Sequence, residues 1–177
     1  MKKIAFLLLL CLTQAVSATA ELTFSALKST YHVGECISLT LQENLQAASR
    51  FHRVDLWAAV QPPSHILGGQ LLFMTPLPFE AFSHNPQLFR ESLEATKRRH
   101  DILDFEVLEG LSGIYTFYAA YVDDGKNPLT EPSALQSNIA EVSTTLSDEP
   151  PLIPVIVLRC CLPLRIYWLR RAMPLLS

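Results

Sequence analysis

The sequence holds histidine, aspartate and cysteine side chains, but their spacing forms no recognised reaction motif. There is no Gly-x-Ser-x-Gly, His-Glu-x-x-His or Cys-x-x-Cys pattern, so nothing nominates a nucleophile or a zinc site. Arg99, His100 and Asp101 are adjacent, and neighbours on a strand point to opposite faces, so they could not cooperate as acid and base. We therefore expect structural roles for the five histidines, His32, His52, His65, His84 and His100.

One acidic stretch, from Asp123 to Asn127 (DDGKN), has the oxygen-rich composition of a calcium loop. It lacks the twelve-residue spacing and the terminal Glu of an EF-hand, and Asp-Gly is a common turn signal. We predict a hairpin turn. Asp123 and Asp124 remain weak metal candidates, and no cofactor is expected.

The cysteine pattern argues against a disulfide framework. Beyond residue 20 there are three cysteines, an odd number, and the neighbours Cys160 and Cys161 cannot bridge each other without strain. Cys36 is out of phase with the apolar residues Ile37 and Leu39 of its strand. We expect Cys36 to be a free, partly covered thiol.

Most of the chain between residues 21 and 147 alternates apolar and polar residues with a period of two, which is typical of half-buried strands. Gly, Pro and Asp-Gly turn signals separate these segments. The segment 113–122 is apolar on both faces and predicts a central strand. A body of this size buries one core, so about seven antiparallel strands imply a two-layer β-sandwich. The predicted strands are 22–26, 33–41, 54–60, 69–75, 102–108, 113–122 and 138–146.

One segment departs from the strand pattern and predicts a short helix over 86–99. Asn85 supplies an N-cap, Pro86 fits the first helical position, and Phe89 and Leu93 are four residues apart. The cluster Lys97–His100 would then be a cationic helix end that faces solvent.

The first twenty residues have the pattern of a secretory signal peptide. Lys2 and Lys3 precede an apolar run from Ile4 to Leu12, and small residues near Ala18 and Ala20 offer cleavage sites. The run is shorter than the about 20 residues of a membrane span. We expect a secreted, periplasmic or cell-surface protein of bacterial character.

Charge divides the rest of the chain unevenly. Residues 21–147 contain fifteen acids and eight Lys and Arg, which disfavours binding to nucleic acid. Residues 148–177 contain four Arg, and no acid follows Glu149. This Pro- and Leu-rich tail fails as a membrane span because Arg159 and Arg165 interrupt it. It is either sequence outside the fold, such as translation in a shifted frame, or an apolar interaction tail.

Two segments resemble bacterial immunoglobulin-like modules. Residues 31–41 (YHVGECISLTL) are similar to their second strand, and residues 110–122 (GLSGIYTFYAAYV) resemble the E–F corner and the F strand. The resemblance implies an immunoglobulin-like β-sandwich from a secreted Gram-negative protein, with an accessory or adhesive role. It places Tyr115 at the corner, its hydroxyl bonded to main chain near Glu109 or Gly110, and Phe117 where the second core cysteine would stand.

Side chains alternate between the two faces of a strand, and we call this alternation strand parity. Together with the sandwich topology, it suggests an aromatic patch. Trp57 and Tyr118 would face away from the core on adjacent strands, where they could stack on a sugar or a partner surface. Alternatively, the segment 76–99 folds over that sheet and buries both rings.

We therefore expect an exported, non-catalytic accessory or adhesion module that binds a protein or glycan at the cell surface. The alternatives are a small secreted hydrolase or metal-dependent enzyme, and a remnant of a larger secreted protein.

Overall fold

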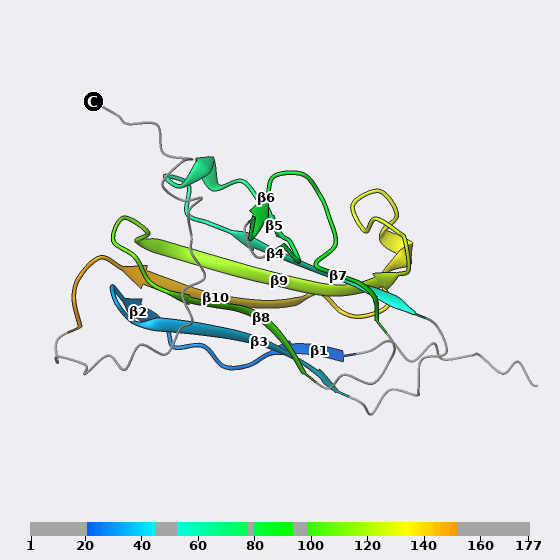
Figure 1. Ribbon diagram of the computed structural model, residues 1–177, viewed down its shortest axis with the longest axis horizontal. Helices are drawn as coiled ribbons and strands as arrows, with labels where there is room; N and C mark the ends of the chain where they lie inside the picture. Colours follow the sequence, from blue (N-terminus) through cyan, green and yellow to red (C-terminus); the bar gives the residue numbers. More distant parts are fainter. Residues whose placement is uncertain (1–20, 45–52, 78–79, 94–98, 152–177) are drawn as a thin grey trace, which may run out of the picture.

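The computed structural model describes residues 21–44, 53–77, 80–93 and 99–151, which form two stacked β-sheets (Figure 1). The smaller sheet has the order β1–β3–β8 and is antiparallel throughout. It consists of β1 (Glu21–Phe24), β3 (Cys36–Asn44) and β8 (Arg99–Glu106).

The larger sheet has the order β2–β10–β9–β4–β5–β6, and β7 also pairs with β4. Only the β2–β10 pair is parallel among the described strands. The N-terminal segment of the described chain thus pairs in one sheet as β1 and in the other as β2. The strands are β2 (Thr30–His32), β10 (Ala140–Ser147), β9 (Gly113–Asp123), β4 (Val54–Gln61), β5 (Leu72–Met74), β6 (Phe82–Ser83) and β7 (Arg90–Leu93).

The all-β sandwich expected from the sequence is confirmed, and each of the seven predicted strands has a counterpart. The structure adds three short strands, β2, β6 and β7. The added strand β2 runs parallel to β10, whereas the predicted strands pair antiparallel. The helical turns of the described chain are two short 3-10 segments, Leu67–Gly69 and Pro132–Ala134.

The predicted helix over 86–99 is wrong where the structure describes it. Arg90–Leu93 is a strand that pairs with β4, and the Phe89 N–H donates to the Leu56 carbonyl at 2.8 Å. Ser92 has a φ of 52°, outside the helical region. Pairing with β4 therefore overrides a locally favourable helix pattern; residues 94–98, with much of its cationic end, lie outside the described residues.

The main core lies between the sheets and follows the parity predicted for most strands. Ile37, Leu39 and Leu41 of β3 are fully buried and lie on the same face of the strand. In β8 the register shifts, because Leu39 pairs with Leu103 whereas Thr40 pairs with Asp101. Ile102 is thus an extra, bulged residue, and both Ile102 and Leu103 pack against the core.

A second apolar layer covers the outer face of the larger sheet. Trp57 and Phe73 contact edge to face, with ring centroids 6.1 Å apart. Ala59, Val122 and Ala134 complete the buried part of this cluster, and Leu88 packs against it. The covering residues come from the segment before β7 and from the 3-10 turn Pro132–Ala134.

Asp55 anchors the segments that form this cover. It lies on β4 and is completely buried. One carboxylate oxygen accepts the Ser92 N–H at 2.8 Å, and the other accepts the Gly125 N–H at 2.7 Å. A single side chain thus ties β7 and the turn after β9 to the central strand.

We predict that Asp55→Ala lowers the free energy of unfolding by about 3 kcal/mol, because the N–H groups of Ser92 and Gly125 lose their charged acceptor. Asp55→Asn retains one acceptor oxygen, so we expect its free energy of unfolding to lie between those of wild type and Asp55→Ala. Denaturant titration measures both. The matched control is Asp124→Ala, an exposed acid on the neighbouring turn, expected to change stability by less than about 0.5 kcal/mol. Equal effects at the two positions would contradict the anchoring role of Asp55.

The sandwich ends with β10 at Ser147, but the next two residues still bind the body. The Asp148 carboxylate accepts the Gly110 N–H at 2.8 Å, and the Glu149 carbonyl is 2.9 Å from His32 Nδ1. The expected signal peptide and the tail beyond Pro151 lie outside the described residues. No helix in the described segments is long and apolar enough to cross a membrane.

We predict that residues 21–151 unfold cooperatively without the tail. Truncation after Ser147 should lower the free energy of unfolding by about 1 to 2 kcal/mol relative to residues 21–151, because Gly110 and His32 lose hydrogen-bond partners. Circular dichroism during thermal unfolding compares the two truncations. A non-cooperative transition for 21–151 would show that the tail is part of the fold.

Candidate functional site

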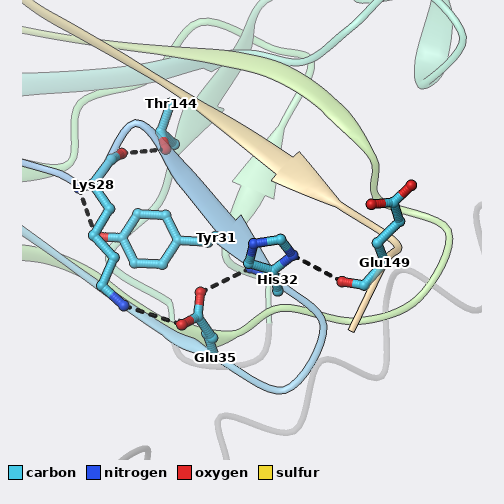
Figure 2. Close-up of polar contacts among 6 residues, drawn as sticks. All are labelled: Lys28, Tyr31, His32, Glu35, Thr144 and Glu149. Carbon is cyan, nitrogen blue, oxygen red and sulfur yellow. Dashed lines mark hydrogen bonds and ion pairs between the residues drawn. The ribbon is translucent and has the colours of Figure 1, made fainter. Parts of the chain in front are cut away.

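A cluster of polar side chains surrounds β2 and the end of β10 (Figure 2). Gly34, with a φ of 84°, allows the tight turn after β2, which brings the Glu35 side chain back beneath the strand. One Glu35 oxygen accepts the His32 N–H at 2.9 Å, and the other lies 3.1 Å from Lys28 Nζ. Lys28 Nζ also lies 5.3 Å from the centre of the Tyr31 ring.

The environment of Glu35 favours its ionised form. Partial burial raises the carboxyl pKa, but the His32 N–H and the Lys28 ammonium together lower it further, so the pKa lies below its usual value. This carboxylate therefore stays charged at neutral pH. Its charge is used to hold the turn and the strand rather than to exchange protons.

The remaining contacts of the cluster join β2 to β10. His32 Nδ1 lies 2.9 Å from the Glu149 carbonyl, which can only accept, so Nδ1 carries the proton in this bond. The Thr144 hydroxyl donates to the Lys28 carbonyl at 2.8 Å. Because these side chains bind main chain, the cluster acts as a clasp on the edge of the larger sheet.

A second polar group is buried inside the sandwich. His100 is 1% exposed, and its Nε2 lies 2.6 Å from the Tyr121 hydroxyl, which donates to Glu43 at 3.1 Å. The hydroxyl must then accept from His100 Nε2–H, which fixes the histidine tautomer. Tyr121 is likewise 1% exposed, and we assign the buried His100–Tyr121 pair a structural role.

The structural role expected for the histidines therefore fits His100 and His32, whose bonds hold strands together. His65 and His84 are exposed, and His52 lies outside the described residues. Arg99 and Asp101 flank His100 on the opposite, solvent side of β8 and pair with each other at 3.2 Å. This geometry agrees with the expectation that His100 and Asp101, as neighbours on a strand, point to opposite faces and cannot act as an acid–base pair.

The predicted aromatic patch is wrong for Trp57. Its ring points away from the main core, as parity predicts, but it is only 8% exposed because the second apolar layer covers it. The alternative, in which the segment 76–99 covers this sheet, is correct in part. Leu88 of that segment packs against the cluster around Trp57, but Ala134 of the 3-10 turn also covers it.

Tyr118 lies beyond this cover and is half-buried. Its hydroxyl donates to Gln61 at 3.4 Å. Thr116 and Ser143, whose hydroxyls are 2.9 Å apart, lie on the same side of β9 and β10, and Ile114 is 62% exposed beside them. We call this surface the β9–β10 face.

The corner bond expected for Tyr115 is wrong. Its ring packs between the two core clusters, but its buried hydroxyl has no hydrogen-bond partner among the described residues. The Gly110 N–H binds Asp148 instead. Burial, followed by the charge of Asp148, raises the pKa of Tyr115 to about 12. Phe117 is 2% exposed and lies in the main core.

Asp123 and Asp124 form a turn, in which the Lys126 N–H donates to the Asp123 carbonyl at 3.0 Å. The turn leads into the long connection to β10 rather than into a tight hairpin, which corrects that detail. Among the described residues, no group of three or more His, Cys, Asp and Glu side chains is placed to hold a metal ion.

Cys36 is a free thiol of intermediate exposure, as predicted from its phase in β3. Sequence reasoning missed Asp55, although an acid between the apolar residues Val54 and Leu56 was a visible signal. It also missed Asn138, whose amide group binds both the N–H and the carbonyl of Leu22.

We predict that Tyr115→Phe raises the free energy of unfolding by about 1 kcal/mol, because it removes a buried hydroxyl without a partner and keeps the ring. Tyr115→Ala is expected to lower it by about 3 kcal/mol through lost packing. Thermal or denaturant unfolding near neutral pH measures both. A loss of stability in the Phe variant would mean that the hydroxyl is bonded after all.

The raised pKa of Tyr115 also predicts an alkaline effect. A proton held more tightly in the folded state contributes stability that is full below pH 10 and is lost as the pH rises from about 10 to about 12. Wild-type stability should therefore fall over this range relative to Tyr115→Phe, since other titrating groups are common to both proteins.

Comparisons with known proteins bear only on architecture. No protein-family model and no curated protein matches the chain. Among solved structures, it is similar to the CARDB domain of a Pyrococcus furiosus protein, determined in complex with di-metal ions. The TM-score is 0.39 with 13% sequence identity, and the match covers 74% of this chain and 93% of that one.

Proposed function

We propose that this chain is an exported, non-catalytic accessory module that binds a protein or glycan at the surface of a bacterial cell. The signal-like N-terminus supports export, and the resemblance of the strand motifs supports an origin in a secreted Gram-negative protein. The side chains of Asp55, Glu35 and His100 hold strands and turns together, so we assign these three groups to the fold rather than to a reaction.

The observation that carries this proposal is the β9–β10 face. The second apolar layer covers the part of the larger sheet around Trp57 and leaves uncovered the part around Tyr118. An aromatic ring beside the hydroxyls of Thr116 and Ser143 suits contact with a sugar or with a polar protein surface. One such ring adds about 0.5 to 1.5 kcal/mol beyond area burial, so we expect weak binding strengthened by multivalency.

We predict that Tyr118→Ala abolishes binding to a ligand found in a glycan and cell-surface panel, with little change in melting temperature. Tyr118→Phe keeps the ring and should retain most of the binding. The matched control is Leu108→Ala, an exposed apolar residue elsewhere on the surface that should leave binding intact. Equal binding by Tyr118→Ala and wild type, or hydrolase activity in a substrate screen, would contradict the proposal.

A further inference from the structure

A carboxylate lies beside the aromatic ring of the β9–β10 face. Glu141 of β10 and Tyr118 of β9 are direct partners in the antiparallel pairing of these strands. Glu141 is exposed, and no Lys, Arg or His side chain of the described residues forms an ion pair with it. Its charge is therefore available to a ligand that lies on the Tyr118 ring.

The hydrogen-bond pattern of β10 places this carboxylate close to the ring. Thr145 N–H donates to the Ser29 carbonyl at 3.0 Å, on the side of β10 away from β9. Residues two positions apart on a strand point their main-chain polar groups to the same side, so Glu141 and Tyr118 form a non-hydrogen-bonded pair. The Cβ atoms of residues that pair in this way are about 5 Å apart.

Other polar groups surround the ring and restrict it. The Tyr118 hydroxyl lies 3.4 Å from Gln61 Oε1, and Gln61 Nε2 lies 3.5 Å from the Gly69 carbonyl, which links the ring to the turn after β4. On the next pair along the strands, the hydroxyls of Thr116 and Ser143 are 2.9 Å apart. A ring that is already restricted loses little freedom when a ligand stacks on it.

The size of the uncovered surface favours a sugar over a protein. Ala120 is buried beneath the second apolar layer, so the uncovered part of β9 runs from Tyr118 to Ile114, about 14 Å. Across the sheet, the strands β4, β9, β10 and β2 together span about 15 Å. The resulting area of about 200 Å² is well below the about 800 Å² that each partner buries in a stable protein interface. A short oligosaccharide fits this surface.

The charge of the surface is negative. Among the described, uncovered residues that β4, β9 and β10 present on this side, Glu141 is the only one with a charged side chain. The chain between residues 21 and 147 also has seven more acids than Lys and Arg, which favours the approach of a cation. The uncharged residues on this side are Gln61, Ile114, Thr116, Tyr118, Ser143, Thr145 and Ser147.

We propose that the β9–β10 face binds glycans whose sugar units carry a free amino group, in preference to the same glycans with that amino group acetylated. This inference rests on the proposed function and names the ligand class of the same site. The Tyr118 ring stacks on the sugar, and the Thr116 and Ser143 hydroxyls bind its hydroxyl groups. The protonated amine pairs with Glu141, and acetylation removes that charge.

The expected preference is modest because the ion pair is exposed. Exposed pairs change an equilibrium constant by about two- to five-fold, and we expect a preference of this size for the amino glycan. It should decrease as salt is added, because dissolved ions screen exposed charges. A glycan of uronic acid units should bind least, because its carboxylates meet Glu141.

The test is a titration of isotope-labelled residues 21–177 with a glucosamine tetramer and with an N-acetylglucosamine tetramer, followed by amide chemical shifts. Glu141→Gln removes the charge and keeps the size of the side chain. The matched control is Glu106→Gln, an exposed glutamate on β8 of the smaller sheet. Tyr118→Ala removes the ring, and an acetylated tetralysine peptide supplies amines without a sugar.

We expect wild type and Glu106→Gln to bind the glucosamine tetramer about two- to five-fold more tightly than the acetylated one, with shifts at Thr116, Tyr118 and Ser143. In Glu141→Gln the two affinities should become equal. Equal affinities in wild type, or a preference that survives in Glu141→Gln, would overturn the proposal. Tighter binding of tetralysine than of the glucosamine tetramer would also overturn it, because charge alone would then decide binding.

The outcomes separate this inference from the proposed function. Binding of both tetramers with equal affinity, lost in Tyr118→Ala, would overturn the amine preference and leave the binding role of the face intact. If neither tetramer shifts the amides of this face, the inference fails, and the glycan and cell-surface panel decides the proposed function separately.

Discussion

The buried carboxylate of Asp55 is the contact on which the outer half of this sandwich depends. It lies on the central strand β4 and accepts N–H groups from Ser92 and Gly125, far apart in sequence. These bonds hold β7 and the turn after β9 against the sheet, and the segments beside them cover Trp57. Asn138, Glu35 and His32 act similarly, because each supplies a side-chain partner where the backbone lacks a strand.

The inner layer of the fold was predictable because its signal is local. Alternation along β3, β4 and β9 places Leu39, Leu56 and Phe117 on the buried faces, and the structure confirms each of them. The phase of Cys36 and the solvent-facing pair Arg99 and Asp101 follow from the same period of two. Period, turn signals and a chain long enough for one core were sufficient for a two-layer sandwich.

What failed depends on contacts between distant segments. The helix pattern before Arg99 is locally sound, but β4 offers an open edge, and Arg90–Leu93 pairs with it. Parity oriented Trp57 correctly, yet it carries no information on whether another segment covers that face. The hydroxyl of Tyr115 lacks its expected main-chain partner, and the Gly110 N–H binds Asp148, which lies beyond the last strand. The candidate site also depends on contacts between distant segments, so only the outward orientation of Tyr118 could be predicted from the sequence.

The crossing of the N-terminal strand from β1 to β2 has a mechanical consequence. Because β2 runs parallel to β10, tension applied between the two ends of the sandwich pulls these strands in opposite directions along their shared axis. The bonds between them, together with the His32 and Thr144 contacts, are then loaded in shear at the same time rather than opened one by one. The clasp in Figure 2 therefore lies where a tethered module would bear force.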